Sequence, residues 1–225
     1  CGNPRLHKEN DLNQYAEMFQ YVKNVLSYYD AHGRKGKLKF RYNRSEHTMR
    51  VCQWAVRLAD EYPGEIDLDS LKIAAIFHDI GYSVEEDRTS HPANGAKLCR
   101  EYLTARNYPA AQVDFICDLI LRHSDKECIH DDIPAELILL MEADLLDDTG
   151  AQGIVLDIWV ESRREDADYA SMLGHIREYT LRTMQKDSVR TPAAKRIWAE
   201  KRALAESFAE SLSRDLTGDW MEKLI

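Results

Sequence analysis

The adjacent residues His78 and Asp79 offer an imidazole nitrogen and a carboxylate oxygen to the same small space. They close the apolar run 71–77, which predicts a buried helix that ends at this pair. In a dry interior both groups need a partner, and a divalent metal ion satisfies both. The similar pair His130-Asp131 follows no apolar run and stands among acidic residues, which is typical of a solvated loop. We therefore interpret His78-Asp79 as part of a metal site.

A further histidine could reach the same ion from a second helix. Ser45-Glu46 is typical of a helix N-cap and first turn, and apolar residues recur at helical spacing from Val51 onward. His47 lies four residues before Val51, on the inward face of this helix. A lone inward histidine is most often a hydrogen-bonded core residue. His47 therefore supports a metal site only in combination with other ligands.

An aspartate on a third expected helix strengthens the metal interpretation. Asp144 follows Leu137 and Met141 at helical spacing and so shares an apolar stripe with them. A buried carboxylate must be paired or coordinated, because removing its charge from water is costly. Ligand-type side chains that face inward from three separate helices favour one metal site over three independent structural roles.

The order His47, His78-Asp79, Asp144 resembles the H…HD…D signature of the HD-domain metal-dependent phosphohydrolases. The segment 143–154 resembles the A-D-x-x-D-x-x-G-A-x-G-I segment of small, stand-alone bacterial HD hydrolases. One departure is Leu145, because many relatives carry arginine directly after the last metal aspartate. The resemblance implies an all-α, orthogonal helical bundle of HD type with additional N- and C-terminal helices.

Two more histidines match the H…HD…H…H…D order of HD proteins that hold two metals. His91 stands at the expected start of one helix, and His123 ends another on its apolar face. In the resemblance they hold a second ion beside the first, so the expectation is one ion, or two if both histidines are ligands. Two ions roughly 3.5–4 Å apart form a known clamp for displacement at phosphorus.

The function that the resemblance implies is metal-dependent hydrolysis of a phosphomonoester or phosphoanhydride in a nucleotide or similar small phosphorylated metabolite. Asp79 is expected to hold and orient the attacking water, and Arg50 to neutralise a phosphate oxygen, with Arg122 as a weaker candidate. Asp147, one turn after Asp144, is expected to orient a ligand. Histidine and carboxylate ligands suit Mn, Fe, Co, Ni or Zn, with Mg as a further option.

Two other classes of protein stay open on the sequence. Some HD proteins with the six-ligand order are di-iron oxygenases, and His91 with His123 make that reading available here. A non-catalytic nucleotide-binding regulatory module is the other class. The complete set of ligands argues against it, because unused charges are costly to retain in a core.

Composition narrows the remaining classes. Among 225 residues, 44% are hydrophobic and 31% charged, which is typical of a globular protein, and 10 Gly with 6 Pro favour helices over a turn-rich β fold. The formal charge of −9 weighs against a nucleic-acid polymer as partner. No apolar run approaches the roughly 20 residues that cross a bilayer, so no membrane association is expected. Five cysteines without a CxxC pair indicate no disulfide framework and favour a reducing cytoplasm.

The expected organisation is a polar tail over 1–11 and one helical domain over 12–225. Within this domain the metal-binding core spans about 40–160, and a helical extension spans about 165–225. Helices are expected over 12–32, over 168–186 and after Thr191-Pro192. Residues 33–44 form a basic connection, interpreted as a solvated loop or as a rim that attracts an anionic substrate. The last helices are expected to pack on the core or on another subunit, which leaves a homo-oligomer open.

Overall fold

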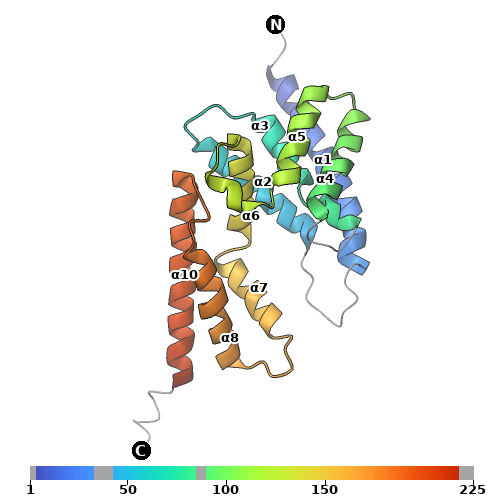
Figure 1. Cartoon of the computed structure of the whole chain (residues 1–225). Helices are drawn as coiled ribbons and strands as arrows, with labels where there is room; N and C mark the ends of the chain where they lie inside the picture. The colour runs from blue at the N-terminus through green and yellow to red at the C-terminus, as the bar shows by residue number, and fades with distance from the viewer. Residues whose placement is uncertain (1–3, 33–42, 85–89, 218–225) are drawn as a thin grey trace, which may run out of the picture. The chain divides into compact units, whose positions relative to one another are not determined.

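The computed structural model describes residues 4–32, 43–84 and 90–217 of the chain (Figure 1). These ranges contain helices and no strand, so the predicted all-α class is confirmed. The chain packs as two compact units, Cys1–Ala143 and Asp144–Ile225, each of which is described by itself. The single-domain organisation expected for 12–225 stays a prediction. No helix within the described ranges is long and apolar enough to span a membrane.

The first unit holds the helices that carry most of the expected ligands. They are α1 (Pro4–His32), α2 (Arg44–Asp60), α3 (Leu68–Phe77), the 3-10 helix η1 (Ile80–Ser83), α4 (His91–Thr104), α5 (Ala110–Arg122), the 3-10 helix η2 (Lys126–His130) and the greater part of α6 (Ala135–Asp147). The helices α1, α2, α4 and α5 all pack against α3. Figure 1 labels these helices.

Helix α3 forms the centre of the first unit. Every residue from Ile73 to Ile80 is buried, and a helix that is apolar on all sides must lie inside a bundle. The helix is capped by Asp67, whose carboxylate accepts hydrogen bonds from the backbone N–H and the hydroxyl of Ser70. Because α3 runs into the core, the residues at its C-terminal end, His78 and Asp79, are delivered to the interior.

Helix α2 begins two residues earlier than the sequence suggests. Asn43 is the N-cap and accepts from the backbone N–H of Glu46 at 3.3 Å, while the Ser45 hydroxyl donates to the same side chain at 2.7 Å. The cap expected at Ser45-Glu46 is therefore wrong, because asparagine satisfies the N–H of the third helical residue equally well. The inward face carries Val51, Ala55 and Leu58 as expected.

Helix α1 also begins earlier than expected, at Pro4, a residue that is favoured in the first turn of a helix. Residues 1–3 of the expected polar tail lie outside the described residues, as do residues 33–42 of the expected basic connection. The buried face of α1 carries Met18, Val22 and Leu26.

The second unit is built from the end of α6 and the helices that follow. They are α7 (Ala151–Glu161), α8 (Tyr169–His175), the π-helix η3 (Ile176–Leu181), α9 (Arg182–Met184) and α10 (Pro192–Thr217). Asp168 and Ser171 form a reciprocal capping box at the start of α8. The Thr191 hydroxyl accepts from the backbone N–H of Ala194 at the start of α10, which is the cap expected there. The helix expected over 168–186 is present, with a π-helical middle that the sequence did not indicate.

Candidate metal centre

Asp79 is the residue on which the site is centred. It follows directly after the buried end of α3, and only 4% of its surface is exposed. Four imidazole rings present their Nε2 atoms to its carboxylate. The distances are 3.7 Å from His47 to Oδ2, and 3.7, 3.5 and 3.9 Å from His78, His91 and His123 respectively to Oδ1. All four histidines are buried.

Four helices of the first unit deliver these histidines. His47 projects from the first turn of α2, and His91 is the first residue of α4. His78 and His123 are the C-caps of α3 and α5. The sequence predicted inward positions for His47, His78 and His123 and placed His91 at the start of a helix, and the structure places all four around one carboxylate. Their role as metal ligands stays a prediction.

Backbone carbonyls orient two of the rings. His78 Nδ1 lies 2.8 Å from the carbonyl oxygen of Ala75, and His123 Nδ1 lies 2.6 Å from that of Ile120. A carbonyl oxygen only accepts, so Nδ1 carries the proton in both rings. In the neutral imidazole, Nε2 then presents a lone pair towards the centre of the site, which is the state that a metal ligand requires.

His91 and His123 form a pair of their own inside this cluster. Their Nε2 atoms lie 3.3 Å apart, and the rings meet edge to face with centroids 5.2 Å apart. The ring of Tyr82, from η1, stacks on His91 with a centroid separation of 4.1 Å. Tyr82 therefore limits how the His91 ring can turn, a contact that the sequence did not indicate.

Arg44 is the residue of the site that sequence reasoning missed. The basic connection predicted over 33–44 includes Arg44, as part of a solvated loop or of a rim that attracts an anionic substrate. The structure instead places it in the first turn of α2, buried, with Nη1 donating to Asp79 Oδ2 at 2.6 Å. Its guanidinium also lies 3.4 Å from the centroid of the Tyr82 ring. A signal was available, because Arg44 precedes His47 by one helical turn and must share its face.

The donor set fits a divalent metal ion. His78, Asp79 and His123 each offer one ligand atom within 4.8 Å of the others, and all three side chains are buried. Imidazole nitrogen and carboxylate oxygen are ligands of Mn, Fe, Co, Ni and Zn. In this buried cluster Arg44 pairs with Asp79 Oδ2, while Asp79 Oδ1 faces three imidazole rings and is the oxygen that would bind an ion.

Gly81 sets how closely η1 approaches the helix that carries His91. A Cβ at this position would lie 2.0 Å from the carbonyl oxygen of His91 and 2.5 Å from the backbone nitrogen of Gly95, so the backbones would have to separate. We expect Gly81→Ala to lower the free energy of unfolding by roughly 3 kcal/mol, as overpacking does. Denaturant unfolding of the variant measures this loss.

Gly174→Ala is the matched control for this substitution. A Cβ at Gly174, within α8, would meet nothing within 4 Å. Replacing a helical glycine by alanine is expected to raise stability by about 0.5–1 kcal/mol. If Gly81→Ala left stability unchanged, the close approach of η1 and α4 would not be a constraint.

The other predicted residues lie as follows. Arg50 is half-buried on α2, one turn after Glu46. Arg122 donates to Asp118 on its own helix at 3.2 Å. Asp144, half-buried, and Asp147, buried, belong to the second unit, and their roles stay predictions. His130 is exposed at the end of η2, which agrees with the solvated position expected for it.

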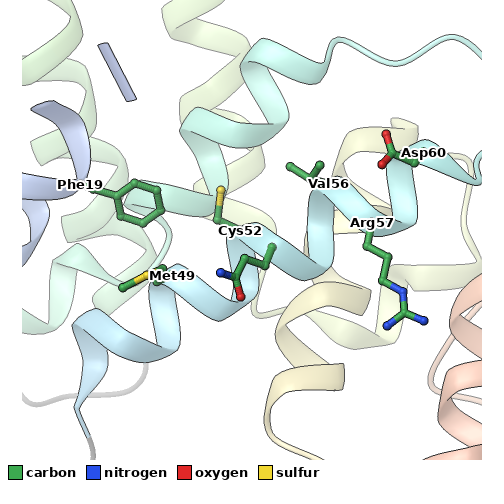
Figure 2. Close-up of a pocket in the computed structure, with 7 residues that line it drawn as sticks. Phe19, Met49, Cys52, Val56, Arg57 and Asp60 are labelled. Atoms are coloured by element: carbon green, nitrogen blue, oxygen red, sulfur yellow. The ribbon is translucent and has the colours of Figure 1, made fainter. Parts of the chain in front are cut away.

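A pocket of about 400 Å³ lies on another face of α2 (Figure 2). It is bordered by side chains of α1 and α2, namely Phe19, Met49, Cys52, Gln53, Val56, Arg57 and Asp60. At 100° per residue, the α2 members project away from the direction of His47. Burial raises the pKa of the Cys52 thiol to about 11, which keeps this thiol protonated and unreactive. The pocket therefore lacks the ligand groups that converge on Asp79.

Residues 44–149 match the family model of the HD domain. This range begins at Arg44 and includes the four histidines, Asp79 and Asp144. The resemblance to the HD domain stated from the sequence is thus confirmed, and residues 44–149 of the chain form an HD domain. A comparison with curated proteins gives no match.

Solved structures share the fold over most of the chain. An HD-superfamily hydrolase from Bacillus thuringiensis is 20% identical, with a TM-score of 0.69 over 93% of this chain and 100% of that chain. YpgQ of Bacillus subtilis in complex with ADP is 20% identical, with a TM-score of 0.67 over 92% and 97%. The Lin1889 protein of Listeria innocua is 23% identical, with a TM-score of 0.62 over 91% and 98%. At these identities the likeness establishes the fold: this chain has the fold of the HD-superfamily hydrolases.

Proposed function

We propose that the chain is a metal-dependent phosphohydrolase that cleaves a phosphomonoester or phosphoanhydride of a nucleotide or similar small metabolite. The observation that carries the proposal is the convergence of four imidazole rings on the buried carboxylate of Asp79 within an HD domain. The complex of YpgQ with ADP supports a small phosphorylated ligand, because that protein shares the fold.

The proposed ligands of the first ion are His47, His78, Asp79 and Asp144, and His91 with His123 are proposed for a second. When bound, a divalent ion lowers the pKa of water from about 15.7 towards 7 and withdraws charge from a phosphoryl oxygen. The chemistry of the ligands favours Mn, Fe, Co, Ni or Zn, and Mg is the harder-cation alternative. The ligand atoms of His78, Asp79 and His123 lie within 4.8 Å of one another, which supports two ions at neighbouring positions around Asp79.

The two carboxylate oxygens of Asp79 have different surroundings, which supports a different role for each oxygen. Oδ2 accepts a charge-assisted hydrogen bond from Arg44, whose guanidinium is held in turn over the ring of Tyr82. Oδ1 instead faces the Nε2 atoms of three histidines. We infer that Arg44 is a positioning residue that keeps the carboxylate in one orientation. Asp79 then holds and orients the attacking water through Oδ1.

The negative charge of a phosphate requires cations beyond the metal site. Arg50 lies on α2 three residues after His47 and is half-buried, so it is proposed to neutralise a phosphate oxygen. Arg122 is the weaker candidate, because its guanidinium already pairs with Asp118. Asp147 is proposed to orient a ligand; it is buried in the second unit.

A di-iron oxygenase is the second candidate function. It is favoured by one observation, namely that His91 and His123 face the same oxygen of Asp79 as His78 does. A second ion would need such additional ligands. Turnover that depends on oxygen, with two irons per chain, would distinguish the oxygenase from the hydrolase.

Metal removal tests the proposed hydrolase. We expect the purified chain to release phosphate from at least one compound in a panel of nucleotides and sugar phosphates when supplied with Mn²⁺ or Co²⁺. Exhaustive chelation should reduce phosphate release to the uncatalysed background, because the proposed mechanism needs the ion to activate water and to withdraw charge from the phosphoryl oxygen. Re-addition of the metal should restore the rate.

Two outcomes of the same experiment would contradict the proposal. Activity that survives exhaustive chelation, with no metal detected by elemental analysis, would overturn the metal-dependent mechanism. If no compound were hydrolysed in the presence of any of the metals, although the protein bound them, the proposed activity would be overturned while the metal site would stand.

A further inference from the structure

Lys201 is a cation on the inward face of α10. It lies three residues after Trp198 and four residues before Ala205, and both of these residues are buried. A lysine is seldom placed on such a face unless its ammonium group has a partner, because its charge must leave water. The partner of this ammonium group therefore indicates what Lys201 does.

The ammonium group of Lys201 reaches the turn that follows α6. Its Nζ donates a hydrogen bond to the carbonyl oxygen of Thr149 at 3.1 Å. The Thr149 hydroxyl donates in turn to the carbonyl oxygen of Leu146 at 3.2 Å, within the last turn of α6. The C-terminal end of a helix carries unpaired carbonyl groups and partial negative charge, so a cation is stabilising there. Lys201 thus links α10 to the end of α6.

The aliphatic part of the Lys201 side chain packs against Gly150, the N-cap of α7. A Cβ on Gly150 would lie 2.9 Å from Lys201 Cγ and 3.2 Å from Lys201 Cβ. Gly150 also has a φ of 72°, a backbone conformation that other residues rarely adopt. The turn between α6 and α7 therefore accepts the lysine side chain only because glycine stands at this position.

Asp147, the last residue of α6, gives Lys201 an opposite charge nearby. Burial lowers the pKa of the Lys201 ammonium group, and the negative charge of Asp147 opposes this shift. Only 2% of Asp147 is exposed, and a carboxylate that is removed from water to this extent is costly without compensation. Lys201 supplies positive charge to this buried end of α6.

We propose that Lys201 is a positioning residue for the candidate metal centre, because it fixes the end of α6 that carries Asp144 and Asp147. The proposal rests on the proposed function, in which Asp144 binds the first ion and Asp147 orients a ligand. The backbone N–H of Asp148 donates to the carbonyl oxygen of Asp144 at 3.3 Å, so a displacement of the turn would move the residue that supplies the ligand. The C-terminal extension thereby contributes to the site, although α10 lies outside the HD domain of residues 44–149.

Two substitutions separate the charge of Lys201 from its packing. Lys201→Met keeps an unbranched apolar side chain against Gly150 and removes the ammonium group. Lys201→Arg keeps a cation that can donate to the carbonyl oxygen of Thr149. If Lys201 only filled space, the methionine variant would behave as the wild type does.

Binding of Mn²⁺ alone, measured from the electron paramagnetic resonance signal of the free ion, tests the proposal without any substrate. Lys201→Met should raise the dissociation constant about 10-fold, since residues that orient metal ligands typically contribute 10–100-fold to affinity. Lys201→Arg should recover most of this loss. In the metal-free chains, hydrogen exchange of the peptide that spans residues 144–154 should be faster in Lys201→Met than in the wild type or Lys201→Arg.

Lys195→Met is the matched control, because Lys195 lies on the same helix but is exposed, with its Nζ 3.6 Å from Asp187 Oδ1. This variant should bind Mn²⁺ as the wild type does. The proposal is overturned if Lys201→Met also binds Mn²⁺ with the affinity of the wild type, or if Lys195→Met loses as much affinity as Lys201→Met.

The proposed function has a separate point of failure. If Lys201→Met binds Mn²⁺ more weakly than the wild type, but the wild type releases phosphate from no compound, the positioning role stands and the hydrolase falls. A wild-type chain that binds none of the proposed ions would overturn both.

Discussion

Asp79→Asn is expected to reduce metal-dependent phosphate release by on the order of 10³-fold or more, because one substitution removes both a proposed metal ligand and the group that orients water. The four imidazole rings would then face a neutral amide, and the partner of Arg44 would lose its charge. Elemental analysis should show loss of bound metal. Circular dichroism should still report a helical protein, since α3 keeps its apolar contacts.

The control for Asp79→Asn is His130→Ala, at the other His-Asp pair of the chain. His130 is exposed on η2, so its removal should leave both metal content and rate unchanged. Full turnover in a metal-loaded Asp79→Asn protein would contradict the assigned role of Asp79. A loss of bound metal in His130→Ala would show that the wrong pair had been chosen.

His91→Ala and His123→Ala should each lower the metal content from about two ions per chain to one, if these residues complete a second site. The first ion would keep His47, His78, Asp79 and Asp144, so it should remain bound. The rate should fall steeply, because the attacking and leaving oxygens would no longer both be neutralised. Elemental analysis and phosphate release from the two variants and the wild type measure both effects.

A purely structural role for these two histidines has a different signature. The wild type would then hold about one ion, and each substitution would cost a hydrogen bond, on the order of 1 kcal/mol, without changing the rate. The Nε2 atoms of His91 and His123 lie 3.3 Å apart in the structure, so each substitution also removes a contact from the other ring. A wild-type count near one would remove the second ion and with it the di-iron oxygenase.

The inward-facing residues of the site could be predicted because each one ends or begins an apolar helix. The run 71–77 could be buried only as a central helix, so the residues that follow it had to enter the core. His47 and His123 could be placed from the apolar faces of their helices, whereas His91 was recognised only as the start of a helix and through the resemblance. Helical periodicity is a local signal, so it is available from the sequence without knowledge of tertiary contacts.

The spacing of Arg44 from His47 could have placed it on the inward face, but its partner Asp79 is distant in sequence, and Tyr82 offers no such local signal. Arg44 follows a basic stretch, and its charge suggested a solvated position. The carboxylate of Asp79 instead holds it in the interior, with Arg44 Nη1 2.6 Å from Asp79 Oδ2. Tyr82 lies in a short 3-10 helix without periodicity, and it stacks on a residue of α4 that the sequence does not connect with it.

The carbonyls that orient His78 and His123 make the lengths of two helices part of the site. Each ring donates to the carbonyl three residues earlier, within its own helix, so the ring direction is set by the last turn of that helix. One inserted or deleted residue inside α3 or α5 would turn the ring by about 100° and move it by about 1.5 Å along the axis. Homologous chains should therefore vary in the exposed side chains of α5, while gaps in an alignment should fall in the connections before and after α3 and α5.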